Sequence, residues 1–73
     1  MTFEYTVVIE PEPEGGFHAY VPALRGCRSD GETEAEAWTN IREAVQLYVE
    51  SLQARGEKVP QETLQVRSLA VAV

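Results

Sequence analysis

The sequence predicts an α+β fold made of three antiparallel strands, one long helix and a final strand. Two patterns predict it. Apolar residues alternate with polar ones on both sides of a turn-rich segment within residues 3–21, and apolar residues recur every three or four positions over residues 34–55. Because a chain of 73 residues buries only about 60% of the surface that it exposes when unfolded, we expect residues 1–73 to form a single domain around one thin core.

The first two strands are predicted to form a hairpin. Residues 3–10 alternate with a period of two, with aromatic and β-branched side chains on one face and mainly polar ones, apart from Val8, on the other. The segment from Pro11 to Gly16 interrupts this pattern, because proline removes a backbone donor and paired glycines accept the positive φ of a tight turn. Over residues 17–21 the apolar side chains face one way and His18 and Tyr20 face the other.

A third strand and the start of the helix follow the hairpin. Residues 27–30 are bounded by Gly26 and Gly31 and are long enough for one more antiparallel strand. The sequence from Thr33 to Glu36 has the spacing of a capping box, in which the hydroxyl and the carboxylate each bind a free backbone N–H. We therefore expect a helix that begins at residue 33 or 34 and ends at residue 55.

The helix is predicted to place one apolar stripe against the sheet. Its members recur at spacings of three and four and are Trp38, Ile41, Val45, Tyr48 and Leu52. Such a stripe indicates a packed core face rather than a cofactor pocket. Gly56 can adopt the left-handed conformation that ends a helix, and Pro60 follows it.

The last segment, residues 62–73, is rich in β-branched residues and is predicted to be a strand. Its pattern changes phase, with Leu64 and Val66 on one face but Leu69, Val71 and Val73 on the other. Either a bulge separates the two sets or the strand is buried on both sides. Since one helix cannot cover both faces of a sheet, we expect a homodimer or a higher homo-oligomer that uses this strand or the uncovered face.

The charge of the chain is concentrated in its first half. Residues 1–37 contain eight acidic and two basic side chains, whereas residues 38–73 contain four of each, so the net charge of −6 belongs to the first half. Such a surface repels nucleic acid and favours a basic protein partner, although it could also serve only to keep the domain soluble. No apolar run is long enough to cross a membrane and no secretion signal is evident, so a cytoplasmic protein is expected.

The residue types for catalysis are scarce. Cys27 and His18 are the one candidate pair of nucleophile and base, but a lone cysteine in a small domain is more often a packing residue. A metal site built from His18, Cys27 and Asp30 would need a fourth ligand that the sequence does not supply at a recognisable spacing. We therefore expect no catalytic residues, no metal and no cofactor. His18 and Tyr20, beside the acidic turn, remain as a candidate binding surface.

An ordered set of short motifs covers nearly the whole chain. They are Tyr5-Thr6-Val7-Val8-Ile9, Glu14-Gly15-Gly16-Phe17-His18-Ala19-Tyr20-Val21-Pro22, Leu24-Arg25-Gly26-Cys27, Asp30-Gly31, Thr33, Glu36-Ala37 and Gly56 to Pro60. In this combination the chain resembles the HicB-like antitoxin family. The resemblance implies a partial ribonuclease-H-like fold of order β-β-β-α-β that lacks the catalytic carboxylates of true ribonucleases H.

The resemblance also implies a function. A HicB-like domain binds a small basic HicA-type toxin that cleaves messenger RNA, and it shields the toxin's catalytic histidine and RNA surface. Many members add a C-terminal DNA-binding domain, whereas this sequence ends at Val73, so a stand-alone N-terminal domain without direct nucleic-acid binding is expected. The family often has proline at the position of Arg25.

Most family-motif residues have an evident structural role in turns, caps or core. They are Gly15, Gly16, Val21, Pro22, Leu24, Gly26, Cys27, Gly31 and Thr33. For toxin contact the resemblance and the charge together favour Glu10, Glu12, Glu14, His18 and Tyr20. Two alternatives stay open: an orphan dimeric domain that acts as a scaffold or binds a small ligand, and an enzyme of degenerate ribonuclease-H-like or Cys27 hydrolase type.

Overall fold

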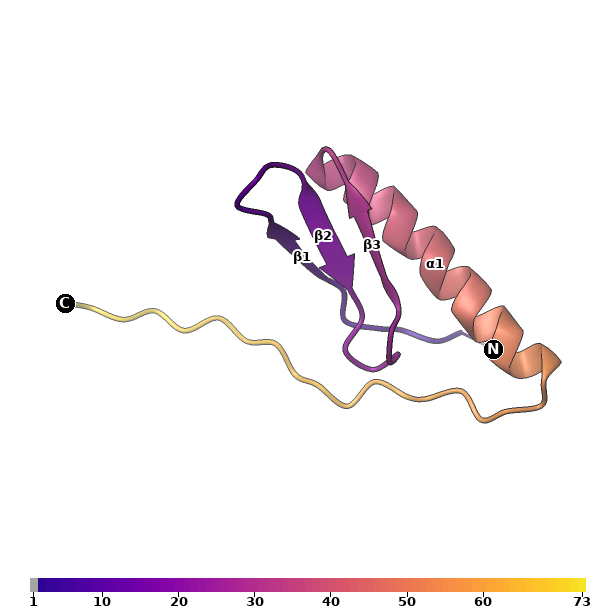
Figure 1. The fold of residues 1–73 in the computed structure, drawn as a ribbon. Helices are drawn as coiled ribbons and strands as arrows, with labels where there is room; N and C mark the ends of the chain where they lie inside the picture. The colour runs from indigo at the N-terminus through magenta and orange to yellow at the C-terminus, as the bar shows by residue number, and fades with distance from the viewer. Residues whose placement is uncertain (1) are drawn as a thin grey trace.

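A computed structural model describes residues 2–73. Three strands, β1 (Val8–Pro11), β2 (Phe17–Tyr20) and β3 (Arg28–Gly31), precede one helix, α1 (Glu34–Ala54). The strands form one antiparallel sheet in the order β1-β2-β3, and α1 lies across one face of it (Figure 1). The predicted three antiparallel strands followed by one long helix are therefore confirmed.

The hairpin of β1 and β2 has the predicted turn. Within it the N–H of Glu12 donates to the carbonyl of Gly16 at 2.9 Å, and the N–H of Gly15 donates to the carbonyl of Glu12 at 3.0 Å. Gly15 and Gly16 have φ angles of +107° and +79°, a region that side chains with a Cβ rarely occupy. The pair of glycines thus closes the turn that sets the register Glu10–His18 between the strands.

The helix begins and ends close to the predicted positions. The hydroxyl of Thr33 accepts from the N–H of Glu36 at 3.1 Å, and the Glu36 carboxylate accepts from the N–H of Glu32 at the same distance. The first bond satisfies a backbone donor that the first helical turn leaves free, as the capping-box spacing predicted, whereas the second reaches Glu32, one residue before the N-cap, instead of the N–H of Thr33. At the other end Gly56 has a φ of +69°, which terminates the helix.

The core is small and lies between the sheet and α1. Its buried members come from β2, the loop that follows β2, and the first half of the helix; they are Ala19, Val21, Leu24, Cys27, Ala37 and Ile41. Tyr5, Val7, Ile9, Phe17, Val45 and Tyr48 are half-buried around them. The predicted core role of Ile41 is correct, and Val45 and Tyr48 are packed at the edge of the core.

The prediction that Trp38 lies in the core is wrong, because its side chain is 45% exposed. The reason is the close approach of α1 to β3. A Cβ placed on Gly31 would lie only 2.3 Å from the backbone nitrogen of Ala37, so the inner position of this helical turn has room only for a small residue. Trp38 follows one position later and points outward, where Arg42 lies 5.9 Å from the centre of its ring.

The loop between β2 and β3 folds tightly into the core. The N–H of Val21 donates to the carbonyl of Cys27 at 3.1 Å, and the N–H of Cys27 donates to the carbonyl of Leu24 at 3.0 Å. The Tyr48 hydroxyl donates to the Arg25 carbonyl at 2.9 Å and so ties the loop to the helix. Cys27 is only 5% exposed, and desolvation by burial raises the pKa of its thiol.

The predicted final strand is wrong. No strand follows α1 in the described residues. The chain after Gly56 continues as an extended tail, residues 57–73, which first turns back along the body and then extends away from the sheet (Figure 1). Its start is attached to the body, because the Tyr5 hydroxyl donates to the Pro60 carbonyl at 2.6 Å and the N–H of Thr6 donates to the Glu62 carboxylate. A strand forms its backbone hydrogen bonds only where another strand lies beside it along its length. The end of the tail, residues 63–73, instead extends past the edge of the sheet (Figure 1).

No helix in the described part of the chain is long and apolar enough to span a membrane.

The first strand begins later than predicted. Residues 3–7 are extended but unpaired, because the register of β1 with β2 starts at Val8 opposite Tyr20.

Replacing Gly31 with alanine should destabilise the fold by about 3 kcal/mol, because the added methyl group overlaps the backbone of Ala37 and forces α1 away from β3. The free energy of unfolding from urea titrations measures the loss. Gly15→Ala is the control, since its Cβ would meet no atom within 4 Å and only the backbone strain of about 1 kcal/mol remains. Equal losses in the two variants would contradict the close packing at Gly31.

The buried thiol of Cys27 should react slowly with a maleimide at pH 8. The raised pKa keeps the thiol protonated where an ordinary cysteine is partly ionised, and burial blocks access. We expect labelling of the native chain to be roughly tenfold slower or more than that of the urea-unfolded chain. A Cys27→Ala, Gln53→Cys chain is the control, because Gln53 is exposed. Equally fast labelling of Cys27 in the native chain would contradict a buried thiol.

Candidate functional site

The face of the sheet opposite α1 carries the polar side chains of all three strands. Strand pairing places Glu10, His18 and Asp30 in one row across the sheet and Val8, Tyr20 and Arg28 in the next. Because successive side chains of a strand point to opposite faces, Ala19 of β2 enters the core while its two neighbours remain on this side. We call this surface the outer face, defined by those two rows and Glu12.

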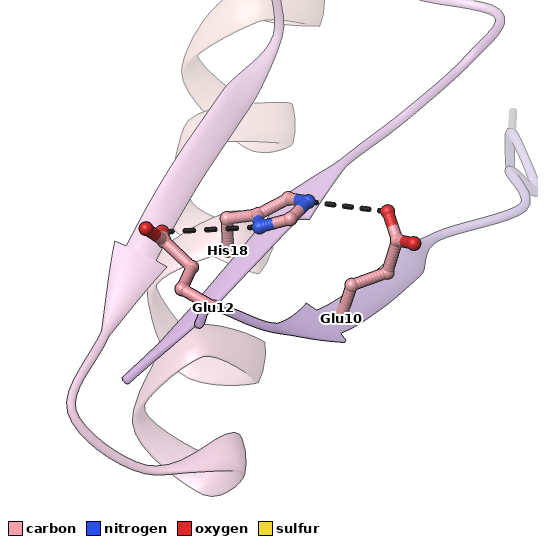
Figure 2. Close-up of polar contacts among 3 residues, drawn as sticks. All are labelled: Glu10, Glu12 and His18. Carbon is pink, nitrogen blue, oxygen red and sulfur yellow. Dashed lines mark hydrogen bonds and ion pairs between the residues drawn. The ribbon is translucent and has the colours of Figure 1, made fainter. Parts of the chain in front are cut away.

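His18 lies between two carboxylates on the outer face. Its Nε2 atom is 3.1 Å from Oε1 of Glu10, and its Nδ1 atom is 3.8 Å from Oε1 of Glu12 (Figure 2). The side chain of His18 is 39% exposed, and those of Glu10 and Glu12 are 52% and 42% exposed. A protonated His18 would donate to Glu10 and attract Glu12, whereas a neutral ring leaves both carboxylates with their full charge.

Tyr20 continues the outer face beside His18. The two rings are stacked with their centroids 6.2 Å apart and their planes 16° from parallel. Tyr20 is 37% exposed, so one side of the ring is available to a partner. An exposed aromatic ring next to charged groups is a common feature of protein-binding surfaces.

The structure brings together four of the five predicted contact residues. Glu10, Glu12, His18 and Tyr20 share the outer face. Glu14 lies in the turn, is exposed, and has no hydrogen bond or ion pair within residues 2–73. It extends the negative charge beyond the end of the hairpin without joining the His18 contacts.

Two charged residues of this face were not among the predicted contact residues. Arg28 pairs with Tyr20, and Asp30 pairs with His18, so β3 adds one charge of each sign to the outer face. With Glu12 these side chains line a shallow hollow over β2 and β3. The alternation of Arg28 and Asp30 within the predicted third strand was the signal that could have placed them here.

The candidate catalytic pair of Cys27 and His18 has no support in the geometry. Cys27 belongs to the buried core, its thiol pKa is raised rather than lowered, and the ring of His18 is engaged by Glu10. A nucleophilic cysteine requires the opposite shift, toward the thiolate. Within residues 2–73 no group of three or more His, Cys, Asp or Glu side chains has a geometry that could hold a metal ion.

The family-motif residues lie behind the outer face, in the turns and the core. Val21, Leu24 and Cys27 are buried, Thr33 caps α1, and Gly31 contacts Ala37. Gly15, Gly16 and Gly26 have positive φ, and Pro22 directly follows β2. These residues shape the scaffold that presents the acidic side chains.

Comparison with known proteins identifies relatives over nearly the whole chain. The UPF0150 protein ssr1765 of Synechocystis sp. is 49% identical over 71 residues, which cover 97% of this chain and 90% of that protein. The UPF0150 protein Ta0767 of Thermoplasma acidophilum is 44% identical over 59 residues, 81% of this chain and 86% of the relative. A UPF0150 protein of Helicobacter pylori is 49% identical over 47 residues, 64% of each chain.

A family match agrees with these relatives. Residues 5–71 match the family described as HicB_like antitoxin of bacterial toxin-antitoxin system. The match includes the hairpin, the whole of α1 and most of the tail. The chain therefore belongs to the HicB-like antitoxin family.

Proposed function

We propose that this protein is an antitoxin that binds a small basic HicA-type, messenger-RNA-cleaving toxin and masks its active site. Family membership supports an antitoxin role in general and implies a toxin as partner. The observation that carries the specific proposal is the acidic outer face, on which Glu10, Glu12 and Asp30 are presented around His18 with only Arg28 opposing them.

The proposed mechanism is competition for the toxin's basic surface. A protein that cleaves RNA must bind phosphates, and it does so mainly with lysine and arginine side chains. Carboxylates fixed on a rigid hairpin can pair with the same side chains and exclude the RNA. Tyr20, which is partly exposed and stacked on His18, would supply apolar contact at the centre of this surface.

His18 would hold the carboxylates of the outer face in position until the toxin binds. In the free protein the ring lies between the two carboxylates. An arginine or lysine of the toxin that approaches Glu10 or Glu12 would replace His18 as the partner of that carboxylate. Glu10 and Glu12 would thus be kept in place before binding, and on binding they would form stronger, charge-assisted hydrogen bonds with the toxin.

The proposal includes several properties of the protein itself. It acts by occlusion and not by catalysis, as one domain of residues 1–73, in the cytoplasm and as a homodimer, and it makes no direct contact with nucleic acid. It further includes a partial ribonuclease-H-like fold, with which the β-β-β-α order agrees, and a structural role for Cys27, which is buried in the core.

The first test is to recover the toxin. We expect the tagged protein, captured from its own cells, to bring down a small basic protein that mass spectrometry identifies. The complex should not cleave RNA, and the partner should cleave it after denaturing elution and refolding. A folded bait whose co-purified partner has no RNA-cleaving activity once freed would contradict the proposal.

The second test separates charge from fold. Replacing Glu10, Glu12 and Glu14 together with lysine should slow association with the toxin by roughly tenfold or more at low salt and weaken its salt dependence. The matched control replaces Glu43, Glu50 and Glu57, which are exposed and lie on or just beyond α1, so that the net charge changes equally. Equal association rates in the two variants, measured by stopped-flow fluorescence, would exclude the outer face as the docking surface.

A further inference from the structure

His18 is the one side chain of the outer face whose charge changes near neutral pH. Among ordinary side chains only histidine titrates between about pH 5 and 8, and the chain contains a single histidine. Burial raises the pKa of the Cys27 thiol and so moves it further from this range. Any change of charge on the outer face between about pH 5.5 and 7.5 therefore takes place on the ring of His18.

The ring of His18 has a carboxylate beside each of its nitrogen atoms. Oε1 of Glu10 lies 3.1 Å from Nε2, and Oε1 of Glu12 lies 3.8 Å from Nδ1 (Figure 2). A neutral ring carries a proton on one nitrogen only, so it donates to one carboxylate and presents a lone pair to the other. A protonated ring has a donor for each. The two carboxylates therefore complement the protonated ring better than the neutral one.

The remaining charged and titratable groups near His18 come from the same face of the sheet. Asp30 of β3 lies opposite His18 in the strand register, and Arg28 lies opposite Tyr20 in the next row. Tyr20 stacks on the imidazole ring with the centroids 6.2 Å apart. Arg25, in the loop after β2, lines the same shallow hollow. The helix α1 covers the opposite face of the sheet (Figure 1), so its charged side chains do not face the ring.

A proton on His18 halves the net charge of the outer face. This face carries three acidic side chains, Glu10, Glu12 and Asp30, and one basic side chain, Arg28, so its net charge is −2 with a neutral ring and −1 with a protonated one. The added charge lies between Glu10 and Glu12. A basic side chain of a partner that pairs with these carboxylates would therefore meet a cation of like sign, which opposes binding.

We propose that a proton on His18 and a basic partner compete for Glu10 and Glu12, so that the protein releases its partner when the pH falls. When an arginine or lysine of the partner pairs with the two carboxylates, the ring loses its proton to the solvent. By linkage, a partner that displaces the proton is itself displaced by the proton. This inference rests on the proposed function, because it takes the outer face as the surface that binds a basic protein.

The direction of the pH effect follows from the form of the ring that the complex favours. Above the range in which histidine titrates, the ring is neutral and both carboxylates are available to the partner, so the affinity is highest. Below that range the ring is protonated and holds both carboxylates, so the affinity falls. Aspartate and glutamate ordinarily remain ionised down to about pH 5, so a loss of affinity between about pH 7.5 and 5.5 belongs to His18 and not to the carboxylates.

The test uses a fluorescent hexa-arginine peptide as the basic partner, and the full chain is titrated into it at low salt. We expect the dissociation constant, measured by fluorescence anisotropy, to be about threefold or more higher at about pH 5.5 than at about pH 7.5. In a ¹⁵N-labelled chain the amide signals of residues 10–12 and 18–20 should move on binding. The ring signals of His18 should move toward those of the neutral form when the peptide is added at about pH 6.5.

Three variants separate the proton on His18 from the total charge of the chain. His18→Gln keeps a neutral donor and should bind the peptide equally at both pH values, whereas His18→Arg keeps a positive charge and should bind weakly at both. The matched control is His18→Gln, Gln46→His. It moves the histidine to α1, where Gln46 donates to the Glu50 carboxylate at 2.9 Å, and it should remain independent of pH. Circular dichroism of each variant should show an unchanged helical signal.

The inference and the proposed function fail in different ways. A pH dependence that persists in His18→Gln, or that returns in the control with a histidine at position 46, would assign the effect to total charge and overturn the competition. A peptide that does not bind at either pH, or that moves only signals of α1, would also overturn it. A captured toxin that binds equally at both pH values would overturn the inference and leave the antitoxin function intact. A pH-dependent peptide complex without a recoverable toxin would support the competition and contradict only the proposed function.

Discussion

A single helix can cover only one face and one edge of a three-stranded sheet, and the rest of this molecule depends on that constraint. The helix α1 packs so tightly on β3 that Gly31 has no space for a Cβ beside Ala37. It also binds the carbonyl of Asp30 through Asn40. What remains uncovered is the outer face, with its acidic side chains, and the edge of β1. The proposed toxin contact uses a surface that the helix does not reach.

The outer face gains its order from contacts within it rather than from the core. His18 is positioned by two carboxylates and by the ring of Tyr20. Each contact is partly exposed, so it adds little to the stability of the fold. Together these contacts hold a small set of charged groups in place on a short, rigid hairpin. Less conformational entropy is therefore lost when a partner binds.

Local features were predictable from the sequence because they depend on residues close together in the chain. The glycine turn, the capping box at Thr33 and the alternation around His18 belong to this class. The orientation of Trp38 was not, because the phase of the helix is fixed by its contact with Gly31, on another element. Strand pairing is likewise non-local. The β-branched composition of the tail indicates a preference for strand structure. It does not indicate which strand edge, or which copy of the chain, would pair with the tail.

The alternation of side chains along each strand separates the residues that pack in the core from those that face solvent. In β2, Ala19 packs under the helix while His18 and Tyr20 face solvent. The glycines, the cap and the buried residues that mark the family therefore define a scaffold, and the side chains between them can change without disturbing it. Under the proposed function, the outer positions would determine which partner such a domain recognises. Family membership agrees with the scaffold, whereas in the proposed complex the choice of toxin would depend on charges such as those of Glu10 and Glu12.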